Sequence, residues 1–268
     1  MATAKKLIFA PIFAISLIVL ISQLPPLLES SDLIFSLSLA TLTQLITISI
    51  LISLSSLLFV LFASLTLDWK IILPVGLLVS LSSLIFLEPA IGIVFAVGVF
   101  VSLLVSFLSL ENTLKSYLTF QPNTLFGPSI RHLSSFLILV IAITYFLAVN
   151  KVIAQNGFQI PDSLIDTTLQ FAQPKTDQQD TPQLSIPQDL SNDLIKSTVN
   201  DQIQNLIKPY LNFIPAILAL LLFFTLQSLN SLINLFIAPL IWLIFLVLEK
   251  SGFIKFTTEM RPVKKMVL

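Results

Sequence analysis

Residues 33–67 of the chain read LIFSLSLATLTQLITISILISLSSLLFVLFASLTL, a run with no charged residue, no glycine and no proline. A helix crosses the bilayer core of about 30 Å with about 20 apolar residues, because it rises about 1.5 Å per residue. The 35 residues of this run would form about 52 Å of helix. Because no turn signal interrupts the run, the sequence predicts one long membrane helix that is tilted or protrudes from the bilayer.

The composition of the whole chain is typical of an integral membrane protein. Of its 268 residues, 56% are hydrophobic and only 10% are charged, and the mean hydropathy is +0.97. A soluble domain carries about 25% charged residues, which is far more than this chain has. Lys plus Arg equals Asp plus Glu, 14 each, so the charge does not indicate a nucleic-acid partner. Cysteine is absent, which excludes disulfides and thiol chemistry.

Four further apolar runs before residue 150 are also predicted to span the membrane. They are residues 7–24, 71–87, 90–110 and 133–149. Pro25-Pro26 ends the first run, and Glu88-Pro89 separates the two middle runs, because proline removes a donor and disfavours helix before it. Residues 111–132 are interpreted as a moderately polar loop, part of which can lie along the membrane surface. No small-residue cleavage site precedes Pro25, so the first run is interpreted as an uncleaved span.

Residues 151–208 form a polar insertion between the fifth run and the next apolar stretch. Two short amphipathic helices are predicted in it, joined by residues 173–188, QPKTDQQDTPQLSIPQ, which are typical of a flexible linker. The insertion is too small and too poor in apolar residues for a sizeable core of its own. We therefore expect it to pack on the membrane domain, on a second copy in a homo-oligomer, or on a membrane partner.

Residues 209–249 are apolar again and are followed by a basic tail, residues 250–268. Residues 210–248 would form about 58 Å of straight helix, nearly twice the thickness of the bilayer core. The chain is therefore predicted to fold back, as a transmembrane hairpin or as one span plus a re-entrant segment. The expected position of the turn is a polar cluster consisting of Gln227, Ser228, Asn230, Ser231 and Asn234.

The positions of Lys and Arg predict the sidedness, because cytoplasmic flanks carry an excess of both. Lys5, Lys6 and the 111–132 segment are then cytoplasmic, and the 151–208 insertion is extracytoplasmic. Seven spans would leave the basic tail outside, against the rule, whereas six would place it in the cytoplasm. The sequence leaves both counts open, and an inverted orientation would violate the rule at the N-terminus. The fold class is therefore an all-α polytopic transmembrane bundle of six or seven spans.

The sequence contains no motif typical of a catalytic or metal site. H-E-x-x-H, G-x-S-x-G and P-loop motifs are absent and His132 is the only histidine, so no cofactor is predicted. Glu88 is the acid closest to membrane depth and is interpreted as a loop residue between two spans. Gln227, Asn230 and Asn234 recur at helical spacing and, with Gln44, are candidates for a polar path. The same four residues would serve equally well as hydrogen-bonding contacts between helices.

Small residues four apart at Gly92 and Ala96, and at Gly98, Ser102 and Ser106, predict close approach between helices. The C-terminal part of the chain also carries a resemblance. Residues 207–228 (IKPYLNFIPAILALLLFFTLQS) and 240–268 (LIWLIFLVLEKSGFIKFTTEMRPVKKMVL) resemble stretches in uncharacterised multi-pass membrane proteins of small-genome bacteria. The resemblance implies a location in the bacterial inner, or cytoplasmic, membrane and implies no activity.

Three functions remain open at this stage. The leading interpretation is a non-enzymatic membrane component or scaffold, surrounded by the lipid bilayer, whose 151–208 insertion binds a partner or another copy. The alternative is a channel or transporter for a small solute that passes Gln44, Gln227, Asn230 and Asn234. The third is a lipid-modifying membrane enzyme built from loop carboxylates.

Overall fold

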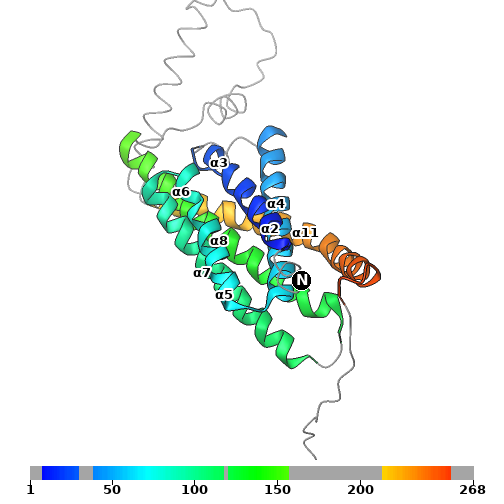
Figure 1. Ribbon diagram of the computed structural model, residues 1–268. Coiled ribbons are helices and arrows are strands. Elements are labelled where there is room, and N and C mark those ends of the chain that lie inside the picture. Colours follow the sequence, from blue (N-terminus) through cyan, green and yellow to red (C-terminus); the bar gives the residue numbers. More distant parts are fainter. Residues whose placement is uncertain (1–7, 30–38, 118–119, 157–212, 255–268) are drawn as a thin grey trace, which may run out of the picture.

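The computed structural model describes residues 8–29, 39–117, 120–156 and 213–254 (Figure 1). Within these ranges the secondary structure is helical, with no strand. The helices are α2 (Phe9–Ser22), α3 (Pro25–Glu29), α4 (Leu39–Thr66), α5 (Trp69–Leu81), α6 (Ser83–Phe86), α7 (Pro89–Ser116), α8 (Pro122–Asn156) and α11 (Ile214–Lys250). The predicted insertion lies almost entirely outside the described residues.

Six stretches of the described residues are long and apolar enough to cross a membrane. They are α2 with α3, α4, α5 with α6, α7, α8 and α11. Large apolar side chains cover their outer faces, including Phe236, which is 76% exposed, and Ile85, which is 79% exposed. Such a surface is compatible with lipid rather than water. The chain is therefore an all-α polytopic membrane helix bundle, as the sequence predicts.

Consecutive spans run in opposite directions, so the bundle has two ends. Contacts between side chains show which segments meet at each end. At the Lys250 end, the Phe9 ring lies 6.3 Å from the Phe253 ring, joining the start of α2 to the residues after α11. Phe120 precedes α8, and the centre of its ring lies 5.5 Å from the centre of the Phe245 ring near the end of α11. At the Glu88 end, the Glu88 carboxylate before α7 pairs with Lys151 near the end of α8. Six crossings thus bring both ends of the described chain to the Lys250 end.

Helix α4, formed by the apolar run that begins at residue 33, occupies the centre of the bundle. It packs against α2, α5, α7, α8 and α11, and more of it is buried than of any other described span. Helices α7 and α8 approach closely where Gly98 faces Val140, because a Cβ on Gly98 would lie 2.8 Å from a Val140 methyl carbon. The predicted role of Gly98 in close helix approach is thus confirmed.

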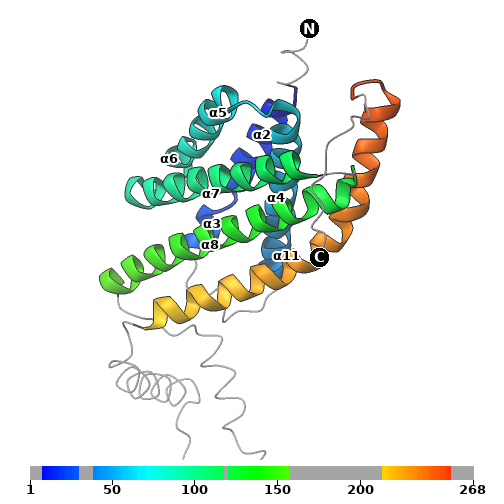
Figure 2. The same ribbon diagram turned by 90° about the horizontal axis from the view of Figure 1, so that it is seen from below.

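The predicted fold-back within residues 209–249 is wrong, because α11 is one continuous helix from Ile214 to Lys250. The polar residues expected to form a turn lie inside it, and three of them make hydrogen bonds there. Ser228 Oγ donates to the carbonyl of Phe224 at 2.8 Å, and the amides of Gln227 and Asn230 bond to side chains of neighbouring helices. Pro239 lies inside the helix, where proline breaks the backbone hydrogen-bond ladder and bends the axis. Figure 2 shows α11 following α8 along its first part and then turning away.

The predicted 111–132 loop is also mostly helical. Helix α7 continues to Ser116, and α8 already begins at Pro122, a residue suited to the first turn. The early turns of α8 are held by packing that is remote in sequence, because the Phe126 ring stacks on Phe245 of α11 at 4.8 Å. In contrast, the single span predicted at 71–87 divides at Ser82 into α5 and α6.

Candidate polar site between α8 and α11

A pocket of about 340 Å³ lies between α8 and α11. Its lining from α8 consists of Asn123, Gly127, Ile130, Arg131 and Ser135. Its lining from α11 consists of Gln227, Asn230, Ser231, Asn234, Leu235, Ile237, Ala238 and Ile241. Three of the four residues proposed from the sequence, Gln227, Asn230 and Asn234, are therefore brought together in one cavity.

Asn230 anchors the inner side of the pocket to the central helix. Its side chain is almost fully buried, and its Oδ1 accepts a 2.6 Å hydrogen bond from Ser53 Oγ of α4. Ser53 lies fourteen residues from Leu39 and thirteen from Thr66, the two ends of α4. The contact is therefore close to the middle of the span α4, and an unpaired polar group within a membrane span is costly.

Gln227 and Asn234 each present an oxygen atom that has no hydrogen-bond partner among the described residues. The Gln227 Nε2 donates to Ser135 Oγ of α8 at 3.1 Å, but its Oε1 is buried and unpaired. The Oδ1 of Asn234, about two helical turns further along α11, is buried and unpaired as well. A buried polar atom without a partner costs about 1–3 kcal/mol, so each of the two oxygens is destabilising unless it gains a donor.

Arg131 supplies the charge of the pocket. Its side chain is exposed, and its Nε donates a long 3.4 Å hydrogen bond to the carbonyl of Gly127, one turn earlier in α8. No acidic residue lies among the described residues that line the pocket. Asn123, near the start of α8, lines the same side, so this part of the pocket faces the Lys250 end. The pocket is thus lined by one positive charge and by the side-chain amides of Gln227, Asn230 and Asn234.

Gln44 does not belong to this site. It lies nine residues before Ser53 on α4, or about 13 Å along the helix towards the Glu88 end. Its side chain is half-buried, and it is not among the residues that line the pocket. The sequence prediction of four residues on one continuous polar path is therefore not reproduced as a single cavity.

The partners of the three amides could not be selected from the sequence. Ser53 is one of many serines in the 33–67 run. Ser135 falls in the predicted span 133–149, and Arg131 falls in the predicted 111–132 loop. The sequence does offer a signal for Arg131. It lies two residues before the apolar run that begins at Leu133, and a charged residue so close to a span suggests a functional site. Two further buried hydroxyls without a partner among the described residues, Ser49 and Ser134, lie on α4 and α8 next to these positions.

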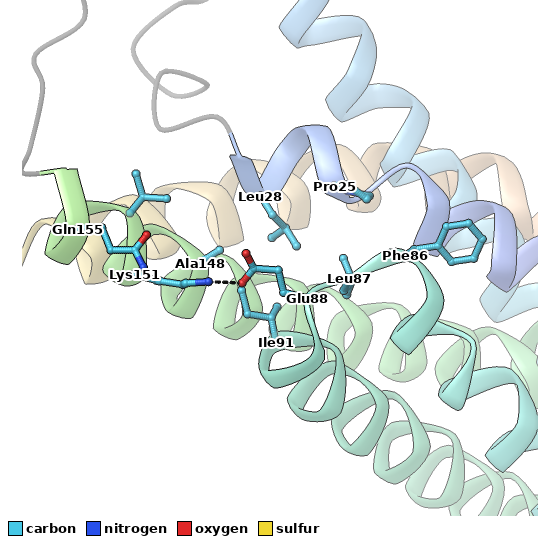
Figure 3. A pocket seen from close by; sticks show the side chains of 10 residues that line it. Pro25, Leu28, Phe86, Leu87, Glu88, Ile91, Ala148, Lys151 and Gln155 are labelled. Carbon is cyan, nitrogen blue, oxygen red and sulfur yellow. Dashed lines mark hydrogen bonds and ion pairs between the residues drawn. The ribbon is translucent and has the colours of Figure 1, made fainter.

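A second, smaller pocket of about 170 Å³ lies at the Glu88 end (Figure 3). Pro25, Leu28 and Ile91 line it beside the ion pair between Lys151 Nζ and Glu88 Oε2 at 2.5 Å. Both charged side chains are about half exposed, at 47% and 57%. Glu88 directly precedes α7 and sits between two spans, where the sequence places it, so it is not a carboxylate at mid-membrane depth.

The remaining sequence candidates form no reactive cluster. His132 is exposed next to Arg131. In the part of the chain that the structure describes, no group of three His, Cys, Asp or Glu side chains is arranged to hold a metal ion. Comparison with known proteins finds no matching family model, no matching characterised protein and no matching solved structure.

Proposed function

We propose that this membrane protein is a channel or transporter for small polar solutes, which bind in the pocket between α8 and α11. The observation that carries the proposal is the cavity itself, which the side-chain amides of Gln227, Asn230 and Asn234 line together with Arg131. Residues that only hold helices together satisfy one another, as Asn230 and Ser53 do. Gln227 and Asn234 line the cavity, and each keeps an oxygen that no described residue bonds, so their amides are not fully used in joining helices.

The hydrogen bonds next to the pocket also support a solute path that is closed on one side. The part of the pocket lined by Asn123 and Ile241 lies towards the Lys250 end. Beyond it, the Ser53–Asn230 and Gln227–Ser135 hydrogen bonds tie α11 to α4 and α8. Such bonds in membrane proteins contribute about 0.6–2 kcal/mol each, so a modest movement of α11 would break them. The unpaired hydroxyls of Ser49 and Ser134 would then be available to a passing solute.

We further propose that the Lys250 end is cytoplasmic and that the membrane is the bacterial inner membrane. Lys70, Lys115 and Lys250 lie at this end, and with six crossings the basic tail would be on the same side. The conflict between seven spans and the charge rule then does not arise. Residues 151–208 would be extracytoplasmic.

Water access to the pocket is the first test. The chain has no cysteine, so single cysteines can be introduced without a background signal. We expect Asn234→Cys to react with a membrane-impermeant thiol reagent. We expect Phe236→Cys, two residues away on the lipid-facing side, to stay unreactive, because Phe236 is 76% exposed and does not line the pocket. Equal reactivity of both variants, or no reaction at Asn234→Cys, would contradict the proposed site.

Solute flux is the second test. Proteoliposomes are expected to take up at least one of glycerol, glycerate, serine or betaine faster than empty liposomes. The Asn230→Leu, Asn234→Leu double variant should lose this uptake, because both amides then disappear from the pocket. Ser228→Leu is the control, since Ser228 is exposed and bonds only to its own helix. Uptake that is unchanged in the double variant would rule out this pocket as the route.

A second proposed function, a scaffold that binds a partner or another copy through residues 151–208, is supported by a different observation. Helices α8 and α11 pack against each other as antiparallel neighbours (Figure 2). A connection of about 2–8 residues joins such helices in bundles, but 56 residues separate Asn156 from Phe213. The connection is therefore much longer than the packing of α8 against α11 requires. Replacing residues 159–210 with a short Gly-Ser linker should therefore change the oligomeric state or the co-purifying proteins; an unchanged result would contradict the scaffold role.

A further inference from the structure

We infer that a second cavity, at the Lys250 end of the bundle, binds a methylated ammonium group, carried either by a lipid head group or by a free solute. This cavity is a different site from the pocket of the proposed function, and the inference does not depend on that pocket. Among the described residues, an aromatic lining, a single carboxylate and an exposed indole point to a cation of this kind.

The cavity has a volume of about 300 Å³ and lies where the start of α8 meets the end of α11. Its lining consists of Phe120, Pro122, Trp242, Phe245, Leu246 and Glu249. The four residues from α11 follow the first of them at offsets of three, four and seven positions, a spacing that places side chains on one face of a helix. None of the six lines the pocket that contains Asn230, so the two cavities are separate.

Contacts between aromatic rings hold this lining in place. The ring centres of Phe120 and Phe245 lie 5.5 Å apart, and Phe126 stacks on Phe245 at 4.8 Å. Phe245 is buried, whereas Trp242 is 54% exposed and can be reached by a ligand. The face of an aromatic ring attracts a cation, and the indole of tryptophan attracts it most strongly. Trp242 is therefore the principal ring for a bound cation, and the half-buried Phe120 is the second.

The sign of the ligand's charge follows from Glu249. It is the one charged residue among the described residues that line the cavity, and its carboxylate has no ion-pair partner among them or elsewhere in the described ranges. Glu249 also lies in the last turn of α11, where the aligned peptide dipoles leave a partial negative charge. The neighbouring Lys250 does not line the cavity. A cation would therefore be attracted by both sources of negative potential, and an anion would be repelled by them.

The methyl groups of the ligand follow from the shortage of hydrogen-bond acceptors. Apart from the Glu249 carboxylate, the side chains of the lining carry no acceptor, because the Trp242 N–H only donates and the other side chains are apolar. A primary ammonium has three N–H donors, which one carboxylate does not satisfy alone. A fully methylated ammonium places methyl groups against the rings and needs no acceptor, which is the basis of its recognition by aromatic cages.

The test measures the binding of three probes to the purified full-length chain by calorimetry, in nanodiscs of phosphatidylglycerol, a lipid without an ammonium group. Choline carries a trimethylammonium group, ethanolamine carries a primary ammonium, and 3,3-dimethylbutan-1-ol is the uncharged isostere of choline. We expect choline to bind at least about tenfold more tightly than either of the others, a difference of about 1.4 kcal/mol. Equal or tighter binding of ethanolamine or of the alcohol, or no binding of choline at about 10 mM, would overturn the inference.

Variants of Trp242 test the aromatic part of the site. Trp242→Leu should weaken the binding of choline about tenfold, while Trp242→Phe should retain part of the affinity. Phe236→Leu is the matched control, because Phe236 is an exposed aromatic residue of α11 that lies outside the cavity. Equal choline affinity in Trp242→Leu and Phe236→Leu would overturn the assignment.

A variant of Glu249 tests the charge. Glu249→Gln should weaken choline and leave the binding of the uncharged alcohol unchanged, because only choline interacts with the carboxylate by charge. Glu88→Gln, at the opposite end of the bundle, is the control for the loss of one negative charge. Equal choline affinity in Glu249→Gln and Glu88→Gln would overturn the role of Glu249.

The fluorescence of Trp242 locates the bound probe without removing a residue of the lining. The chain has two tryptophans, so Trp69→Phe leaves Trp242 as the only one. Choline should change the emission of Trp242 with the same midpoint that calorimetry gives. Calorimetric binding of choline without a change in this emission would place the ligand elsewhere and overturn the assignment.

Lipid composition distinguishes the two sources of the ammonium group. In nanodiscs that contain phosphatidylcholine, a lipid head group that occupies the cavity would compete with choline and lower its apparent affinity. The same lipid should then quench or shift the Trp242 emission without added choline. Unchanged choline affinity and unchanged emission in these nanodiscs would assign the cavity to a free solute instead.

Discussion

Ser53 on α4 and Asn230 on α11 are 177 positions apart in the sequence, yet their side chains meet at 2.6 Å near the middle of the bundle. This bond ties the last span to the central one, and removing its donor tests its energetic role. Ser53→Ala should lower the free energy of unfolding by about 1–3 kcal/mol, because Asn230 Oδ1 is then buried without a donor. The measurement is reversible unfolding in mixed micelles. Ser56→Ala is the matched control, since the buried Ser56 hydroxyl bonds only to the Ile52 carbonyl of its own helix. An equal loss in both variants would contradict the interhelical role.

The contact between α7 and α8 at Gly98 predicts an overpacking effect. A Cβ at this position would lie 2.8 and 2.9 Å from the two Val140 methyl carbons, so Gly98→Ala should destabilise the bundle by about 1–3 kcal/mol. Gly127→Ala is the control, because nothing lies within 4 Å of its Cβ position, and it should be neutral or stabilising by up to about 1 kcal/mol. Thermal unfolding in detergent measures both. Adding Val140→Ala should rescue Gly98→Ala; the absence of rescue would show that the strain lies elsewhere.

The ion pair at the Glu88 end is expected to make only a small contribution to the free energy of unfolding. Lys151 and Glu88 are about half exposed, and exposed pairs contribute about 0–1 kcal/mol. Lys151→Gln should therefore change the unfolding free energy by less than about 1 kcal/mol, and the change should shrink in 0.5 M salt. Exchanging the two residues, as Glu88→Lys with Lys151→Glu, should retain most of the unfolding free energy that Lys151→Gln loses. A loss of several kcal/mol that does not depend on salt would indicate a buried pair.

The six-span arrangement predicts the accessibility of three single cysteines. Asn112→Cys and Lys264→Cys should be labelled from the same side of the membrane, because two crossings, α8 and α11, separate these positions. Gln179→Cys, in the 151–208 insertion, should be labelled from the other side. The measurement is labelling of right-side-out and inside-out vesicles with an impermeant maleimide. Labelling of Lys264→Cys together with Gln179→Cys would require seven crossings.

The spans were predictable from sequence because hydrophobicity over about twenty residues is a local property. The runs at 90–110 and 133–149 fall inside α7 and α8, and the run at 33–67 contains α4. What failed was the inference that polar residues must form a turn. Gln227 and Asn230 stay inside α11 because Ser135 and Ser53 supply their partners, and these lie 92 and 177 positions away. Tertiary contacts of that separation leave no local signal.

The candidate site was predictable only in part for the same reason. The spacing of Gln227, Asn230 and Asn234 places them on one side of a helix, and all three line the cavity. Gln44 shares their chemistry and was grouped with them, but its position along α4 places it at another depth. Arg131, which gives the cavity its charge, was assigned to a loop because the polar segment before Leu133 gave no sign that α8 begins eleven residues earlier.

The side-by-side packing of α8 and α11 has a consequence for how the membrane domain is assembled. These two helices recognise each other through their own surfaces, including the Phe126–Phe245 stack and the Gln227–Ser135 bond. Continuity of the polypeptide between Asn156 and Phe213 is then dispensable for their association. A chain cut in that interval and expressed as two fragments should reassemble in the bilayer, and evolution would be free to lengthen, shorten or exchange the intervening segment while the bundle stays intact.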